Sequence, residues 1–255
     1  MFPVLRIGPA AIQSAGLLLM LGFFFGLSLS ERFTRKVGEN PGGLTNLILI
    51  PALAGLIAAR FFFVLEHIAL FQKNLAGLVS VDPSLLDPWG GITGAAVAIL
   101  IYGQRKHLEF WAALDRLTPF LAIMAVGIGL AHIASGQAFG APISLPWAIE
   151  LWGVKRQPSQ FYETAGALAI LILLWRQFGA IGVPGMLFLK FAALTSGLVV
   201  FLSAFRGDST LVLGTFRQDQ LLALGVLGLA LFLLEIRALP GKSEEVANSG
   251  TTNRH

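Results

Sequence analysis

The hydrophobic residues of this chain fall into long apolar runs that are separated by short polar segments. An apolar run of roughly 20 residues has the length of a helix that crosses the hydrocarbon core of a membrane. Charged residues concentrate in the segments between the runs. The pattern predicts an all-α, polytopic membrane helical bundle of about seven transmembrane helices. The expected spans are 12–30, 44–71, 90–102, 118–134, 158–174, 186–204 and 220–236.

The polar segments also predict the domain organisation and the orientation. Residues 1–238 are expected to form a single transmembrane domain. The segment 239–255 is polar and lacks hydrophobic periodicity, so a disordered tail is expected there. Arg32, Arg35 and Lys36 directly follow the first span, and basic loops favour the cytoplasmic side of a membrane. We therefore expect the N-terminus outside and the C-terminal tail in the cytoplasm.

Composition supports a membrane protein and limits its chemistry. Of the 255 residues, 55% are hydrophobic and 13% are charged, whereas a soluble domain has about 25% charged residues. Loop Lys and Arg account for the net charge of +4, so no nucleic-acid partner is expected. The chain contains no Cys, which excludes a disulfide, a thiolate nucleophile and a cysteine-based metal site. Thiol chemistry would have to use a thiol of the substrate.

Polar residues that could line a buried site concentrate in the range 127–163. The segment 135–157 contains too many Gly, Pro and polar residues to span a membrane, so we expect it to lie at the outer interface. Trp147 and Trp152 are typical of that location. Pro158 is favourable at the first position of the next helix, because its missing N–H has no partner to lose there.

Two residues of this range have both a structural and a chemical interpretation. His132 lies near the end of the fourth span, where a histidine can be a structural hydrogen-bonding group or a proton carrier. Glu163 shares a helix face with Gln160, three residues earlier. Its charge could stabilise the helix N-terminus, or it could take part in chemistry.

The earlier spans contain further candidates. Arg60 lies inside the second span, where a charge usually faces the bundle interior with a partner. It could form a structural ion pair or bind a lipid phosphate. Gly90 and Gly91 open the third span. They could allow close helix packing or leave backbone N–H groups available to an anion.

The order of these motifs resembles the bacterial prolipoprotein diacylglyceryl transferase family. The resemblance covers nearly the whole chain and is carried by the runs IGPAAI, GLIAAR, WGGITG, GQAFGAPISLPWAI and PSQFYE. It implies transfer of a diacylglyceryl group from phosphatidylglycerol to the lipobox cysteine of a prolipoprotein, with glycerol 1-phosphate leaving. It also implies a multi-pass protein of the bacterial cytoplasmic (inner) membrane that needs no metal or other cofactor.

The reaction that the resemblance implies needs a group that takes up the thiol proton and groups that hold the lipid and its phosphate. His132 and Glu163 are expected to be catalytic and to handle the thiol proton. The expected substrate-binding residues are Arg60, Gly90, Gly91, Gln137, Gln160, Tyr162 and Arg206.

The chain departs from the usual family pattern at several polar positions. The family's fourth-helix Arg falls on Gly129, and its sixth-helix Tyr, Arg and Glu fall on Thr195, Val199 and Ser203. Other substituted positions are Ala15, Trp89, His132, Ser135, Gln137 and Gln157. The chain could therefore be a diverged transferase, or a non-catalytic membrane protein on the same scaffold that binds a lipid or lipoprotein or serves as an assembly subunit. A small-solute transporter is disfavoured, because we find no internal repeat.

Overall fold

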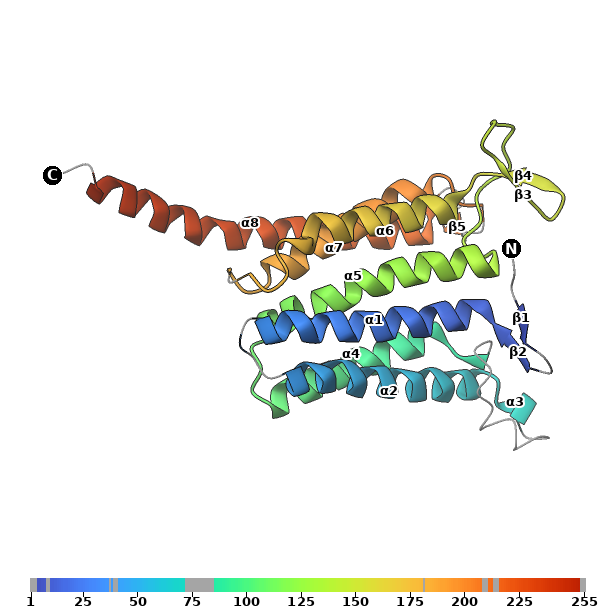
Figure 1. Cartoon of the computed structure of the whole chain (residues 1–255), viewed down its shortest axis with the longest axis horizontal. Helices are drawn as coiled ribbons and strands as arrows, with labels where there is room; N and C mark the ends of the chain where they lie inside the picture. Colours follow the sequence, from blue (N-terminus) through green and yellow to red (C-terminus); the bar gives the residue numbers. More distant parts are fainter. Residues whose placement is uncertain are drawn as a thin grey trace. The chain divides into compact units, whose positions relative to one another are not determined.

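Long helices make up most of the described chain (Figure 1). The computed structural model describes residues 4–7, 10–36, 38, 41–71, 85–180, 182–207, 211–212 and 216–252. The helices are α1 (Ser14–Lys36), α2 (Pro41–Glu66), α3 (Ile68–Phe71), α4 (Pro88–Arg105), α5 (Phe110–Ser135), α6 (Ser159–Trp175), α7 (Met186–Ser203) and α8 (Gln218–Thr252). Within the described residues, 5 helices are long and apolar enough to cross a membrane. The predicted all-α membrane fold is confirmed.

Each of the seven predicted spans coincides with one of the long helices. Their boundaries differ most from the prediction at the end of α8, which extends to Thr252 and not to residue 236, and at the start of α5, which begins at Phe110 and not at residue 118. The N–H of Ala113 donates to the carbonyl oxygen of Glu109, and both Ala113 and Leu117 are buried. This first part of α5 therefore has one buried apolar face. The sequence prediction assigned it to a loop because of its charged residues. The outward orientation of the N-terminus remains a prediction.

Packing divides the chain into two compact units. Unit 1 comprises Met1–Leu29 and Thr118–His255, and unit 2 comprises Ser30–Leu117. The prediction of a single transmembrane domain over 1–238 is not tested by this division. Helix α8 extends to Thr252, into the segment for which the sequence predicts disorder, and disorder of 239–255 likewise remains a prediction.

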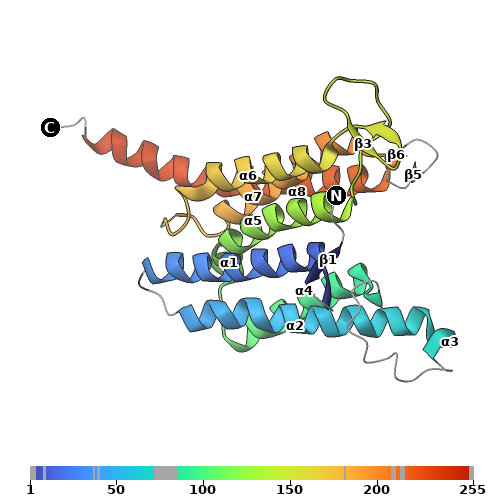
Figure 2. The ribbon, with the colours of Figure 1, turned by 45° about the vertical axis from the view of Figure 1, so that its right-hand side comes forward.

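In unit 1, the first part of α1 packs closely against α5. A Cβ placed on Gly22 would lie 3.3 Å from the Cα of Gly127, so the two backbones approach at small residues. The rings of Phe23 and Phe120 meet edge to face with centroids 5.2 Å apart. Helices α6, α7 and α8 run side by side in both views (Figures 1 and 2). Helices α5, α6, α7 and α8 each contribute residues to one cavity of this unit.

Three antiparallel hairpins complete unit 1. Strands β1 (Val4–Ile7) and β2 (Ala10–Gln13) pair before α1, which therefore begins at Ser14 and not at residue 12. Strands β5 (Leu211–Val212) and β6 (Phe216–Arg217) pair before α8. Strands β3 (Ile149–Leu151) and β4 (Val154–Arg156) pair between α5 and α6.

The β3–β4 hairpin occupies the segment that the sequence excluded from spanning the membrane, and this exclusion is confirmed. Figure 2 shows the hairpin at the beginning of α6. Trp147 and Trp152 are 57% and 66% exposed. Their exposure suits aromatic residues at a membrane interface. Their placement at the outer interface stays a prediction.

In unit 2, small residues let α2 and α4 pack with little space between them. A Cβ on Gly94 would lie 2.2 Å from the Cβ of Ala58, and a Cβ on Gly55 would lie 2.9 Å from the carbonyl oxygen of Gly91. Side chains at these positions would force the helices apart. The interpretation of the glycines at the start of the third span as helix-packing residues is therefore confirmed.

Candidate functional site

A histidine and a carboxylate from different helices form the centre of the candidate site. His132 lies in the last turn of α5 and Glu163 in the second turn of α6, and His132 Nδ1 is 2.8 Å from Glu163 Oε2. Their side chains are 25% and 23% exposed. When Glu163 is ionised its carboxylate only accepts hydrogen bonds, so Nδ1 then carries the proton of this contact. The other ring nitrogen, Nε2, can then accept a proton from a substrate when the imidazole is neutral.

The close approach of α5 and α6 depends on Gly129. A Cβ at this position would lie 2.6 Å from Thr164 Oγ1 and 3.0 Å from Thr164 Cα. Thr164 directly follows Glu163, so this contact sets the spacing at which Glu163 meets His132. The contact also explains one departure from the family pattern, because α6 occupies the space that an arginine at Gly129 would need.

Glu163 lines a cavity of about 140 Å³ that lies wholly within unit 1. Its walls come from α5, α6, α7 and the first turn of α8, and from the segments that follow α5 and α7. The charged lining residues are Glu163, Arg206 and Asp219. Three hydroxyl residues, Ser159, Thr195 and Ser203, also line it, and the other lining residues are apolar. The cavity therefore combines a cation, two carboxylates and an apolar wall.

A second arginine fixes the turn that contains Arg206. Arg217 Nη1 donates to the carbonyl oxygens of Ser203 and Arg206. The Ser203 carbonyl lies at the C-terminal end of α7, where it lacks a partner within the helix and attracts a positive charge, and the Arg206 carbonyl lies in the turn that follows. Sequence reasoning missed this role, because no local pattern relates Arg217 to the end of α7.

The loop after α5 joins Arg206 to the start of α6. Ser159 Oγ donates to the carbonyl oxygen of Ala138 over 2.5 Å, and the N–H of Ala141 donates to the carbonyl oxygen of Phe205 over 2.8 Å. Ala138 has a φ of 54°, which is uncommon for a residue with a Cβ. Such a conformation persists where surrounding contacts hold it, often at functional sites.

The side-chain amide of Gln160 is fully buried and has no hydrogen-bond partner among the residues that the structure describes. It is 0% exposed, and neither its Oε1 nor its Nε2 has a partner among the described residues. An unpaired buried polar group typically costs about 1–3 kcal/mol. The group therefore needs an explanation, and a polar ligand or water that satisfies it is the simplest one.

The other expected residues of unit 1 lie around these groups. The ring of Tyr162 meets Phe205 edge to face with centroids 6.4 Å apart. Gln137 is exposed in the turn after α5, where its N–H donates to Ser135 Oγ over 3.3 Å. Neither residue lines the 140 Å³ cavity.

Arg60, Gly90 and Gly91 belong to unit 2. Arg60 Nη1 donates to the carbonyl oxygen of Leu85 over 2.7 Å, and its guanidinium lies over the Phe71 ring at 5.4 Å. Arg60 is thus tied to the segment that leads into α4. Its convergence on the cavity of unit 1 stays a prediction.

The glycine N–H groups that could have held an anion are already paired. The N–H of Gly90 donates to Asp87 Oδ2 over 2.5 Å, and the N–H of Gly91 donates to the carbonyl oxygen of Asp87 over 3.1 Å. Asp87 is the N-cap of α4, a role that sequence reasoning did not assign to it. The interpretation of these N–H groups as a free anion cradle is therefore wrong. Any other contact of the two glycines with a substrate remains a prediction.

Comparison with known proteins places these features in a family. Residues 3–236 match the family model described as prolipoprotein diacylglyceryl transferase. The chain is 29% identical to the phosphatidylglycerol–prolipoprotein diacylglyceryl transferase of Nostoc sp., over 97% of this chain and 95% of that protein. It is also 29% identical to the proteins of the same name from Thermosynechococcus vestitus, over 88% of both chains, and Clostridioides difficile, over 84% of this chain and 86% of that protein.

Nearly the whole chain is covered by these matches, and its apolar helices are those of a multi-pass protein of the bacterial cytoplasmic membrane. The resemblance seen in the sequence motifs is thereby confirmed. The chain belongs to the prolipoprotein diacylglyceryl transferase family.

Proposed function

We propose that this protein transfers a diacylglyceryl group from phosphatidylglycerol to the lipobox cysteine thiol of a prolipoprotein, a step of lipoprotein maturation. The observation that carries the proposal is the hydrogen bond between His132 and Glu163, at a cavity that Glu163 shares with Arg206. Family membership supports the same reaction class.

The pair supplies the proton acceptor that the reaction needs. The proton of the thiol passes to Nε2 of His132, and the carboxylate of Glu163 stabilises the imidazolium that results. The thiolate sulfur then forms a bond to the glycerol carbon that carries the phosphate. The bond between that carbon and the phosphate oxygen breaks, and its electron pair leaves with glycerol 1-phosphate. The proton held on His132 is finally released to the leaving phosphate or to water.

Arg206 is the proposed phosphate ligand, since a guanidinium forms strong charge-assisted hydrogen bonds with phosphate oxygens. The Gln160 amide, which has no partner among the described residues, is proposed to bond to the ester or hydroxyl groups of the lipid. Arg60 is proposed as a second phosphate contact. Gln137, Tyr162, Gly90 and Gly91 remain proposed substrate-binding positions on the ground of the family motifs.

One observation favours the alternative of a non-catalytic lipid-binding protein. The α7 wall of the cavity consists of uncharged residues that include Thr195, Val199 and Ser203. The hydroxyl groups of Thr195 and Ser203 donate to carbonyl oxygens of their own helix over 2.7 Å. This wall therefore provides no charge to stabilise a leaving phosphate.

Transfer of a labelled diacylglyceryl group to a lipobox peptide by the purified protein tests the proposal. We expect wild-type transfer to fall about 10²- to 10⁴-fold in Glu163→Gln, which removes a charge from the proton-handling pair. A decrease of about 10²- to 10³-fold is expected in Arg206→Ala, which removes the electrostatic stabilisation of the leaving group. Glu150→Gln in β3 and Arg176→Ala after α6 are exposed charge-matched controls and should retain activity.

Binding of phosphatidylglycerol without transfer would reject the catalytic proposal and favour the lipid-binding alternative. Transfer that persists unchanged in both site variants would show that the reaction uses other residues. A peptide with Ser in place of the lipobox Cys serves as the blank.

A further inference from the structure

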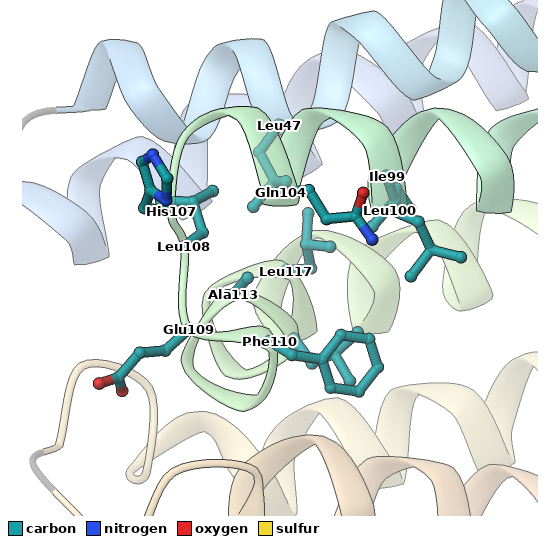
Figure 3. Close-up of a pocket in the computed structure, with 12 residues that line it drawn as sticks. Leu47, Ile99, Leu100, Gln104, His107, Leu108, Glu109, Phe110, Ala113 and Leu117 are labelled. Atoms are coloured by element: carbon teal, nitrogen blue, oxygen red, sulfur yellow. The ribbon is translucent and has the colours of Figure 1, made fainter.

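A second and larger cavity lies wholly within unit 2 (Figure 3). Its volume is about 510 Å³, and it forms where α4 ends and α5 begins, with Leu47 of α2 as part of its wall. It shares no lining residue with the cavity that contains Glu163 and Arg206. Its size falls within the range of small-molecule binding sites.

The lining of this cavity is mostly aliphatic. Leu47, Leu100 and Leu117 come from three different helices and gather in the view of Figure 3. Gly103 lines the same space, and a Cβ built on it meets nothing within 4 Å. The absence of a side chain at Gly103 therefore leaves open volume against an apolar wall, which suits a hydrocarbon chain.

The polar lining residues are few and lie in the last turn of α4 and in the connection to α5. They are Gln104, His107 and Glu109. In Figure 3 the carboxylate of Glu109 points away from the apolar side chains, whereas the amide of Gln104 lies among them. The cavity thus offers an uncharged hydrogen-bonding group beside its apolar wall and turns its only lining carboxylate outward.

Basic residues outnumber acidic ones at this connection, where Arg105 and Lys106 stand against the single carboxylate of Glu109. Arg105, Lys106 and His107 are consecutive and exposed. Within the described residues, neither the Arg105 nor the Lys106 side chain has an ionic partner. Basic residues at a helix end attract the phosphate of anionic lipids, and the positive-inside bias places such an end at the cytoplasmic leaflet.

We propose that the 510 Å³ cavity binds one acyl chain of an anionic phospholipid, whose phosphate contacts Arg105 and Lys106. The apolar wall surrounds the chain, and the Gln104 amide donates to the ester region. This is a lipid-binding site in addition to the proposed donor site, and it does not require transfer activity.

Photocrosslinking in nanodiscs tests the site. The probe is phosphatidylglycerol with a diazirine on one acyl chain, and labelled peptides are mapped by mass spectrometry. We expect labels within residues 99–117 of the wild-type protein. Gly103→Leu should lower that labelling at least 10-fold by filling the cavity, because its Cβ has room. Gly225→Leu on α8 is the matched control, since a Cβ there also meets nothing within 4 Å, and it should leave labelling unchanged.

A charge variant tests the headgroup preference without altering the cavity. Arg105→Glu combined with Lys106→Glu changes only exposed residues, and it should reduce phosphatidylglycerol labelling to the level of a phosphatidylcholine probe. Equal labelling of the wild-type protein by the two probes would overturn the anionic preference. Absence of labels within residues 99–117 of the wild-type protein, or labels there that persist in Gly103→Leu, would overturn the site itself.

Discussion

At the scale of single residues, the buried amide of Gln160 could stabilise the fold or bind the substrate, and its hydrogen bonding distinguishes the two roles. A structural glutamine in a helix bundle would be expected to bond to neighbouring groups, as Thr164 Oγ1 does when it donates to the Gln160 carbonyl over 2.8 Å. The Gln160 side chain has no such partner among the described residues. Removing the amide should therefore change the stability of the fold little and weaken substrate binding more.

We predict that Gln160→Met retains or raises stability, by up to about 1–3 kcal/mol, because an apolar side chain of similar length removes two unpaired buried atoms. Transfer should fall at least tenfold, mainly through a higher KM for phosphatidylglycerol. Denaturation in detergent and a substrate titration measure the two effects. A variant that loses stability but keeps its KM would identify Gln160 as a structural residue.

At the scale of secondary-structure elements, the site depends on how closely α5 approaches α6. The contact between Gly129 and Thr164 lies beside the His132–Glu163 hydrogen bond. A methyl group at Gly129 would meet the backbone of α6, which cannot move as a flexible side chain can. Separating the helices would also separate the hydrogen-bonded pair.

We predict that Gly129→Ala lowers stability by about 1–3 kcal/mol through overpacking. Transfer should also fall, because the helix displacement lengthens the 2.8 Å contact between His132 and Glu163. Gly225→Ala is the matched control on α8, where open space and the better helix propensity of Ala predict a neutral or slightly stabilising change. Equal behaviour of the two variants in thermal denaturation and transfer assays would contradict the packing argument.

At the scale of the whole molecule, its surface is that of a protein surrounded by hydrocarbon. Met20, Ile57 and Phe232 are 74%, 69% and 62% exposed and lie on three different helices. Lipid chains cover such side chains without the penalty that water would impose. Exposed charged side chains occur in the described connections between the helices, as Lys106 and Lys155 show.

The predicted orientation can be measured with single cysteines, because the chain has none of its own. In intact spheroplasts, a membrane-impermeant maleimide should label Lys155→Cys in β4, and it should label Lys106→Cys after α4 only once the membrane is permeabilised. The positive-inside bias predicts this result. The reverse labelling pattern would place the N-terminus and the β3–β4 hairpin in the cytoplasm.

The sequence alone determined the helical membrane fold, its seven long helices and its family. Apolar runs of the length of the hydrocarbon core can satisfy their backbone groups in a membrane only as helices or closed barrels, and their length favoured helices. Motifs such as PSQFYE and WGGITG carried the family resemblance. The start of α5 was less clear, because its charged residues resemble those of a loop.

Only the tertiary structure determined which polar groups meet. His132 and Glu163 are 31 positions apart and bond across two helices. Three further findings had no signal in any local pattern: the Gln160 amide without a partner among the described residues, the pairing of the Gly90 N–H with Asp87 and the contact of Arg217 with the end of α7. Hydropathy reports the environment of each residue separately, whereas hydrogen bonds depend on the spacing of packed helices, and small residues such as Gly129 set that spacing.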